Sequence, residues 1–238
     1  MNDDILNSYK KGFLDGIPIG LGYLSVAFTF GVMCTSANIP VSVALLISMT
    51  NLTSAGQFAG LSLILANASL FEMALTQLII NLRYALMSLS LSQKIDDKVS
   101  TLQRCLIAFG NTDEIFAVAS GSKTDIGPKY MYGLITAPYL GWSLGTLIGA
   151  SASSILPASI MSALGIAIYG MFIAIIIPPT KKFKGIKNVI ILAIIISCIF
   201  KYISIFSFIS NGFAIIICTI IASTYGALAF PIKESNHE

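Results

Sequence analysis

Eight long apolar stretches fill almost the whole chain, and their length constrains the fold more than any other feature of the sequence. A helix needs about 20 apolar residues to cross the hydrocarbon core of a bilayer. Most of the stretches reach that length. They lie at residues 13–35, 40–66, 69–92, 103–121, 130–155, 160–179, 188–207 and 210–230. The sequence therefore predicts an integral membrane protein with six to eight spanning segments.

Composition and periodicity indicate helices and exclude a soluble domain. Only 11% of the residues are charged, whereas a soluble domain carries about 25%. The ten-residue alternation of a transmembrane barrel does not recur, and backbone groups in lipid must be paired within their own segment. We therefore expect an all-α integral membrane protein, a polytopic helical bundle. Residues 1–238 are predicted to form a single transmembrane domain, with residues 1–11 and 231–238 as short cytoplasmic tails.

Cofactors are not expected. The only histidine is His237 in the polar C-terminal tail, so a histidine-based proton relay or metal centre inside the membrane is excluded. The four cysteines show no C-x-x-C spacing, and the sequence therefore supports neither a zinc site nor a disulfide framework. The first apolar stretch lacks a small-residue cleavage site, so we expect a retained span and not a signal peptide.

Two apolar stretches are interrupted by polar residues near their middles. In residues 40–66 the run MTNLTSAGQ separates two apolar halves, and in residues 103–121 the run GNTDE does the same. Asn, Thr, Ser, Gly and Asp loosen a helix or compete for its backbone hydrogen bonds. Unwound backbone at membrane depth survives only where protein or a water-filled cavity surrounds it. Each break is therefore a candidate site, formed by a broken helix or by a re-entrant hairpin.

The placement of Lys and Arg favours a topology with both termini in the cytoplasm. If all eight stretches cross the membrane, Lys94, Lys98 and Arg104 lie outside. If the two interrupted stretches enter and return as hairpins, those three residues move inside and no basic loop residue remains outside. Because basic loops are retained in the cytoplasm, the count favours re-entrant hairpins. Continuous broken helices remain the alternative.

Two stretches carry glycines at every fourth position, which predicts close helix packing. These glycines are Gly12, Gly16 and Gly20 at the start of the first stretch and just before it, and Gly141, Gly145 and Gly149 in the fifth. Small residues at this spacing let helix backbones approach closely in lipid. Both runs also fit one Gly-aromatic-x-x-Gly-x-x-Ile-Gly pattern, which is compatible with an internal repeat.

Arg83 lies deep inside the stretch at residues 69–92, about 4 Å beyond its midpoint. A charge near the centre of a spanning helix costs about 2.5–3.5 kcal/mol, so Arg83 needs an anionic partner. Glu72 is about 16 Å away along the helix axis and is too distant to be that partner. Asn81 and Tyr84 lie on the nearly opposite face of the same helix, so this helix belongs at the centre of the bundle.

Asp113 and Glu114 occupy the middle of the second interrupted stretch, beside Asn111 and Thr112. Two neighbouring acids in a low-dielectric site do not both ionise readily, so one should take up a proton near neutral pH. Intramembrane carboxylates usually mark a transport pathway. We assign proton coupling to Asp113 and Glu114. The alternative is that one or both pair with Arg83 or Lys201 as fixed structure.

The first interrupted stretch offers Thr53, Ser54, Gly56 and Gln57 ahead of a half-helix that is predicted to start near Phe58. Free backbone N–H groups at the start of a half-helix bind a carboxylate well. This segment is therefore a candidate substrate site. The alternative is a simple kink, because membrane helices tolerate Gly and Ser.

Five runs of this sequence resemble the signature stretches of the AzlC-type branched-chain amino acid permeases. They are GFLDGIPIGLGYLSVAFTFG (12–31), SAGQFAG (54–60), NLRYALMSLSL (81–91), FGNTDEIFA (109–117) and LGIAIYGMFIA (164–174). The resemblance implies an exporter of branched-chain amino acids in the bacterial cytoplasmic membrane that works with a small AzlD-like membrane subunit. Many relatives carry an acidic residue and Phe where this chain has Ala167 and Ile168, which puts the substrate in doubt.

Together these features predict a secondary transporter driven by the proton gradient. The substrate carboxylate is expected at the backbone of residues 53–57 and at Arg83, and the ammonium at Asp113 or Glu114. The complete set of predicted substrate-binding residues is Thr53, Ser54, Gly56, Gln57, Asn81, Arg83, Asn111 and Thr112. Expected partners are the AzlD-like subunit, an amino acid and membrane lipid, with no nucleic acid.

Other functions remain open at this stage. A passive channel is one alternative, and an exporter of a different small zwitterionic or organic solute is another. An enzyme is not expected, because an enzyme of this kind needs a nucleophile with a positioned base and the membrane segments contain no histidine.

Overall fold

The computed structural model describes residues 8–95, 99–122, 126–152, 183–206 and 208–231, together with residues 157, 159, 173, 177, 180 and 181. Within these residues the regular elements are all helical, so the predicted all-α fold class is confirmed. The chain divides into two compact units. The first comprises Met1–Leu61 and Asn81–Ile168, and the second comprises Ser62–Ile80 and Tyr169–Glu238.

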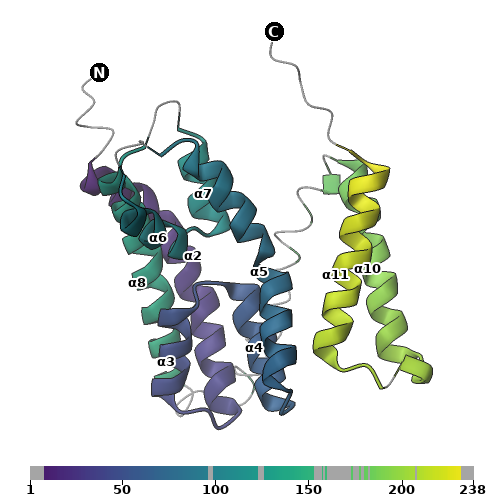
Figure 1. Cartoon of the computed structure of the whole chain (residues 1–238). Helices are drawn as coiled ribbons and strands as arrows, with labels where there is room; N and C mark the ends of the chain where they lie inside the picture. Colours follow the sequence, from purple (N-terminus) through teal and green to yellow (C-terminus); the bar gives the residue numbers. More distant parts are fainter. Residues whose placement is uncertain are drawn as a thin grey trace. The chain divides into compact units, whose positions relative to one another are not determined.

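Figure 1 shows the helices. They are α2 (Tyr9–Ser36), α3 (Val41–Thr50), α4 (Ser54–Leu65), α5 (Leu70–Ser92), α6 (Thr101–Phe109), α7 (Asp113–Ser120), α8 (Pro128–Ala152), α10 (Lys184–Tyr202), the short 3₁₀ helix η1 (Ser204–Phe206) and α11 (Asn211–Ala229). Among the described residues, α2, α5, α10 and α11 are long and apolar enough to cross a membrane. Most of the predicted stretch at residues 160–179, and most of both predicted tails, lie outside the described residues.

Helices α2 and α8 pack backbone against backbone through their glycines. A Cβ atom on Gly12 would lie 2.0 Å from the carbonyl oxygen of Tyr130, and one on Gly149 would lie 2.0 Å from that of Phe28. Only glycine fits at such distances. The predicted glycine packing faces are therefore confirmed. Since the first contact lies near the start of both helices and the second further along both, α2 and α8 run parallel. The internal repeat stays a prediction.

Helices α3 and α4 fold back on each other as a helical hairpin. Gln57 of α4 donates a 2.9 Å hydrogen bond to Ser48 of α3. Further from the turn, Ala44 and Leu61 share one apolar cluster with Phe30 of α2. The open end of this hairpin therefore lies toward the C-terminal end of α2.

Helices α6 and α7 form a second hairpin. In the first turn of α6, Arg104 donates to the carbonyl oxygen of Ser92 at 3.4 Å. At the end of α7, the Lys94 ammonium donates to the carbonyl oxygens of Ser120 and Ser122. Both ends of this hairpin therefore lie at the C-terminal end of α5.

The C-terminal end of α5 adjoins the start of α8. Ile95 and Ile126 form an isolated parallel bridge. Near the start of α8, Tyr130 donates a 2.8 Å hydrogen bond to Asp15 of α2, which also pairs with Lys11 at 2.9 Å. The α6–α7 hairpin thus opens toward the N-terminal end of α2, and the α3–α4 hairpin toward the opposite end.

Sharp helix ends produce the turns into α3 and α5. Asn38 after α2 has a φ of 62°, and Asn67 after α4 has a φ of 51°. In the first case the amide of Ile39 bonds back to the carbonyl of Cys34 at 2.9 Å, and the equivalent bond follows Asn67. This Schellman arrangement closes a helix with a left-handed residue, a conformation that asparagine adopts more readily than most residues.

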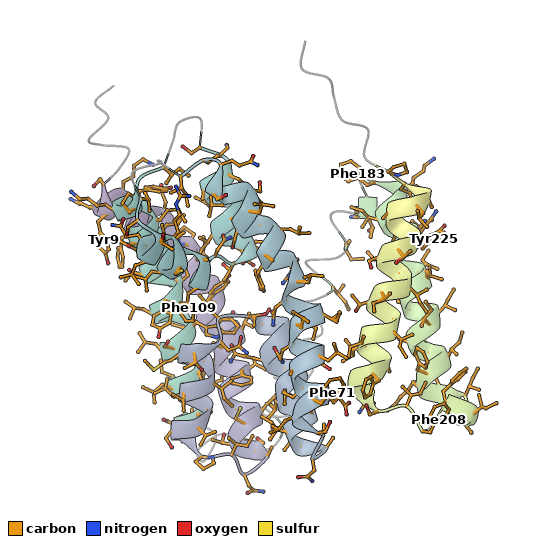
Figure 2. All side chains as sticks on the ribbon, in the orientation of Figure 1. Tyr9, Phe71, Phe109, Phe183, Phe208 and Tyr225 are labelled. Atoms are coloured by element: carbon orange, nitrogen blue, oxygen red, sulfur yellow. The ribbon has the colours of Figure 1, made fainter. Side chains whose placement is uncertain are left out.

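In the second unit, α10 and α11 pack together and the start of α11 binds an acidic residue. Glu72, in the first turn of α5, accepts a 3.1 Å hydrogen bond from the amide of Gly212 and another bond from the Ser210 hydroxyl. A carboxylate suits a helix N-terminus because it satisfies free N–H groups there. Glu72 therefore caps α11. The large apolar side chains Phe71 and Phe208 are mostly exposed (Figure 2).

Candidate functional site

Arg83 finds its anionic partner on the second hairpin. Its Nη1 atom lies 2.7 Å from Oδ2 of Asp113, the first residue of α7. The prediction that Arg83 pairs with an anion other than Glu72 is therefore confirmed. The side chains of the pair are 48% and 43% exposed, so the described residues do not enclose it.

Tyr84 connects Arg83 to the first hairpin by hydrogen bonds. The Nη2 atom of Arg83 donates to the Tyr84 hydroxyl at 3.2 Å, and Tyr84 donates to Oγ1 of Thr53 at 3.3 Å. Thr53 in turn accepts a 3.3 Å hydrogen bond from the amide of Gly56 and so caps the start of α4. Arg83 and Tyr84, neighbours on α5, therefore hold the tips of both hairpins.

Glu114 differs from Asp113 in its partners. Its carboxylate accepts a hydrogen bond from the hydroxyl of Tyr23 on α2, and the same hydroxyl lies 2.7 Å from Oγ1 of Thr112. In the part of the chain that the structure describes, no Lys or Arg forms a salt bridge with Glu114. Of the two predicted proton-coupling acids, one is thus paired with a cation and the other is exposed and held by a tyrosine.

Asn111 is buried in the break of the second hairpin. Its amide nitrogen donates to the hydroxyl of Ser88 on α5 at 3.2 Å. Its Oδ1 atom is buried and has no hydrogen-bond partner among the described residues. Burying such an oxygen without a donor costs about 1–3 kcal/mol, which a bound group with an N–H could recover.

The side-chain amide of Gln57 bonds two protein side chains. Its side chain is 1% exposed, donates to Ser48 and accepts a 2.6 Å hydrogen bond from the indole of Trp142 on α8. Ser48 also bonds Thr146 at 2.6 Å. This network fastens the first hairpin to α8, so we assign the Gln57 side chain a positioning role.

The structure gathers most of the predicted site residues around α5. Thr53, Arg83, Asn111, Thr112, Asp113 and Glu114 lie in one connected group of contacts. Asn81 and Ser54 are half-buried on the same helices, outside the contacts described above. The assignment of these residues to substrate stays a prediction.

Two tyrosines belong to the group although neither was proposed as a site residue. Helical periodicity places Tyr84 on a polar face of its helix, and this signal could have identified it. Tyr23 lies in an apolar stretch whose spacing gives no such signal. Its role depends on the packing of α7 against α2, which the sequence alone does not reveal.

This fold defines a polytopic helical membrane protein in which two helix breaks meet at an ion pair. Comparison with known families then shows to which family the chain belongs. The model of the family described as "AzlC protein" matches residues 18–156, more than half of the chain. The protein belongs to the AzlC family, as its sequence runs predicted.

Relatives of this family are named as membrane proteins. An uncharacterized membrane protein of Archaeoglobus fulgidus is 32% identical over 175 residues, covering 73% of this chain and 76% of the relative. Inner membrane protein YgaZ of Escherichia coli is 28% identical over 182 residues, covering 74% of each chain. An uncharacterized membrane protein of Helicobacter pylori is 29% identical over 154 residues, covering 63% of this chain and 67% of the relative. No solved structure matches the chain.

Proposed function

We propose that this protein is a secondary transporter that exports branched-chain or related amino acids across the bacterial cytoplasmic membrane in exchange for protons. One observation carries the proposal. The half-exposed ion pair of Arg83 and Asp113 lies beside Glu114, where the tips of two helical hairpins meet. Interrupted helices in membranes bind polar solutes at such points, because their ends supply unpaired backbone groups.

The charges around Arg83 are complementary to a zwitterion. A guanidinium binds a carboxylate in bidentate fashion, and Arg83 uses both of its terminal nitrogens on protein partners that a substrate can displace. Glu114 offers a carboxylate to an ammonium group. Positive and negative groups thus lie close together, as an amino acid requires.

The difference between the two acids suggests how protons are coupled. Arg83 compensates the charge of Asp113, whereas the described residues give Glu114 no cation. Glu114 is therefore the acid whose charge a substrate ammonium or a proton can neutralise. A proton and a substrate ammonium then compete for Glu114, and this competition produces exchange: the inward proton releases the amino acid outside.

Basic residues support a topology in which the N-terminus is cytoplasmic and the hairpins re-enter. In the first unit, Lys10 and Lys11 at the start of α2, Lys94 after α5, Arg104 in α6 and Lys129 in α8 all lie toward one end. The turn at the other end of this unit, 37–40, contains no Lys or Arg. Basic segments stay in the cytoplasm. The name of the Escherichia coli relative supports the cytoplasmic membrane as the location.

A small partner subunit is part of this proposal. The most apolar 18-residue window of α10 is 0% buried, and that of α5 is only 11% buried. Such surfaces are available to lipid and to the helices of a partner. We therefore expect efflux to require co-expression of an AzlD-like subunit, and this chain to act as a transporter and not as an enzyme.

Counterflow in liposomes tests the function. The chain is purified with its co-expressed subunit, and labelled leucine uptake is measured against an internal panel of unlabelled amino acids. The proposal expects saturable counterflow with leucine, isoleucine or valine inside, and acceleration of efflux by a proton gradient directed against the leucine flux. A flux without saturation or counterflow would indicate a passive channel. Counterflow that ignores pH and membrane potential would remove the proton from the mechanism.

A further inference from the structure

Tyr23 contacts both sides of the second hairpin's tip from a different helix. Its hydroxyl lies 2.7 Å from Oγ1 of Thr112 and also bonds the carboxylate of Glu114. Thr112 is the N-cap residue of α7, but its side chain makes no capping hydrogen bond to that helix. The hydroxyl of Thr112 is directed to Tyr23 instead.

The hydroxyl of Tyr23 carries one proton and has two oxygen partners. An ionised carboxylate only accepts hydrogen bonds. When Glu114 is ionised, Tyr23 must therefore donate to Glu114, and the Thr112 hydroxyl donates to the oxygen of Tyr23. When Glu114 is protonated, its own O–H can donate to Tyr23, and Tyr23 can then donate to Thr112. In that arrangement the direction of both bonds is reversed.

We propose that Tyr23 is a positioning residue that holds ionised Glu114 toward the substrate ammonium. When Glu114 is protonated, the hydrogen bond between Tyr23 and Thr112 changes direction, and this change reaches the start of α7. The proposal rests on the proposed function only where it names the substrate. Protonation frees the hydrogen of the Thr112 hydroxyl at the helix break, so a proton on Glu114 changes which groups the tip of this hairpin can bind.

Packing fixes the ring of Tyr23 independently of Glu114. The ring lies edge-on to Trp142 on α8, with 5.2 Å between the centroids and 72° between the planes. Trp142 is itself 2% exposed and bonded to Gln57. The ring therefore has a rigid support, and replacing tyrosine by phenylalanine removes the hydroxyl while it keeps this packing.

The other ionisable groups near Glu114 come from the surrounding helices. Asp113 precedes it on α7, and α5 contributes Arg83, which pairs with Asp113, and Tyr84. On α8, Tyr139 packs in the same aromatic cluster as Tyr23, but its hydroxyl donates to the carbonyl of Met49. Of these groups, Tyr23 is the one whose hydroxyl bonds Glu114 directly.

Infrared difference spectroscopy tests the proposal without any substrate. The C=O band of protonated Glu114 is titrated in liposomes and assigned by its loss in Glu114→Gln. In Tyr23→Phe the ionised carboxylate loses a donor, so protonation should occur at higher pH. We expect the midpoint to move up by about one unit, which is a tenfold change in proton affinity. In the wild-type protein, the phenol C–O band of Tyr23 should shift over the same pH range.

Tyr139→Phe is the matched control, because it removes a hydroxyl from the same aromatic cluster and should leave the midpoint unchanged. An unchanged midpoint in folded Tyr23→Phe, or equal shifts in both variants, would overturn the proposal. The pH profile of leucine counterflow is measured in parallel. If the spectroscopic midpoint moves but counterflow is absent or independent of pH, the role of Tyr23 stands and the proposed function fails.

Discussion

The guanidinium of Arg83 lies 2.7 Å from the carboxylate of Asp113, and this single contact joins the middle of α5 to the start of α7. If the pair serves only the fold, exchanging the two charges should preserve both fold and transport. We expect the double variant Arg83→Asp/Asp113→Arg to insert and fold but to lose leucine counterflow, because the order of charges offered to the substrate is reversed. Single replacements Arg83→Ala and Asp113→Asn should also abolish counterflow.

The ion pair of Lys11 and Asp15 gives a matched control for the charge exchange. Its atoms lie 2.9 Å apart, and its side chains are exposed to a similar extent, 43% and 34%. Lys11→Asp/Asp15→Lys should keep counterflow near the wild-type rate. Thermal melting in detergent separates folding from function. Breaking either half-exposed pair should lower the free energy of unfolding by well under 3 kcal/mol, since breaking a buried pair costs about 3–5 kcal/mol. Normal flux in the Arg83 and Asp113 variants would refute the assigned site.

The re-entrant hairpins predict on which side of the membrane each end of α5 lies. With re-entrant hairpins, the turn before α5 faces outward and the segment after it faces the cytoplasm. Continuous crossings reverse both assignments. Ala66→Cys and Gln93→Cys, each at an exposed position, test this in a background without Cys34, Cys105, Cys198 and Cys218. An impermeant maleimide in intact cells should label position 66 and spare position 93. Labelling in the reverse order would establish continuous crossing helices.

The network around Gln57 predicts a measurable loss of stability. Trp142→Phe keeps an aromatic ring but removes the 2.6 Å hydrogen bond to a side chain that is 1% exposed. An amide oxygen left buried without a donor costs about 1–3 kcal/mol. The melting temperature in detergent should fall accordingly. Tyr139→Phe removes a hydrogen bond at a less buried position and should lower it less. Equal decreases in melting temperature for the two variants would mean that the burial of Gln57 does not determine the loss of stability.

Sequence patterns were sufficient to predict the all-α fold class and the anionic partner of Arg83. Apolar length predicted membrane-spanning helices, and among the described residues α2, α5, α10 and α11 are long and apolar enough to cross. The polar runs MTNLTSAGQ and GNTDE fall where α3 ends and α4 begins and where α6 ends and α7 begins. Arg83 was predicted to have an anionic partner because a charge near the centre of a spanning helix is costly, and its distance along the helix excluded Glu72 as that partner. Depth and distance along one helix follow from residue number alone, and for this reason those predictions needed no tertiary information.

Contacts between helices could not be predicted in the same way. Gln57 was expected to bind substrate, and its burial against Trp142 depends on how the first hairpin packs on α8. Tyr23 was overlooked because it lies in an apolar helix, and only the packing of α7 brings Thr112 and Glu114 to it. Polar residues at membrane depth can bind solute or fasten helices, and residue type does not distinguish these two uses.

The glycine contact of α2 with α8 predicts a steep dependence on side-chain size. A Cβ atom at position 149 would lie 2.0 Å from the carbonyl oxygen of Phe28, a backbone atom that cannot move without displacing α2. Gly149→Ala should therefore destabilise the fold by more than ordinary overpacking, which costs about 1–3 kcal/mol. Most of the protein should fail to fold. Gly22→Ala is the control, because nothing lies within 4 Å of its added Cβ atom. Size-exclusion profiles of the two variants in detergent should differ sharply, and a well-folded Gly149→Ala would show that α2 and α8 lie further apart than this packing requires.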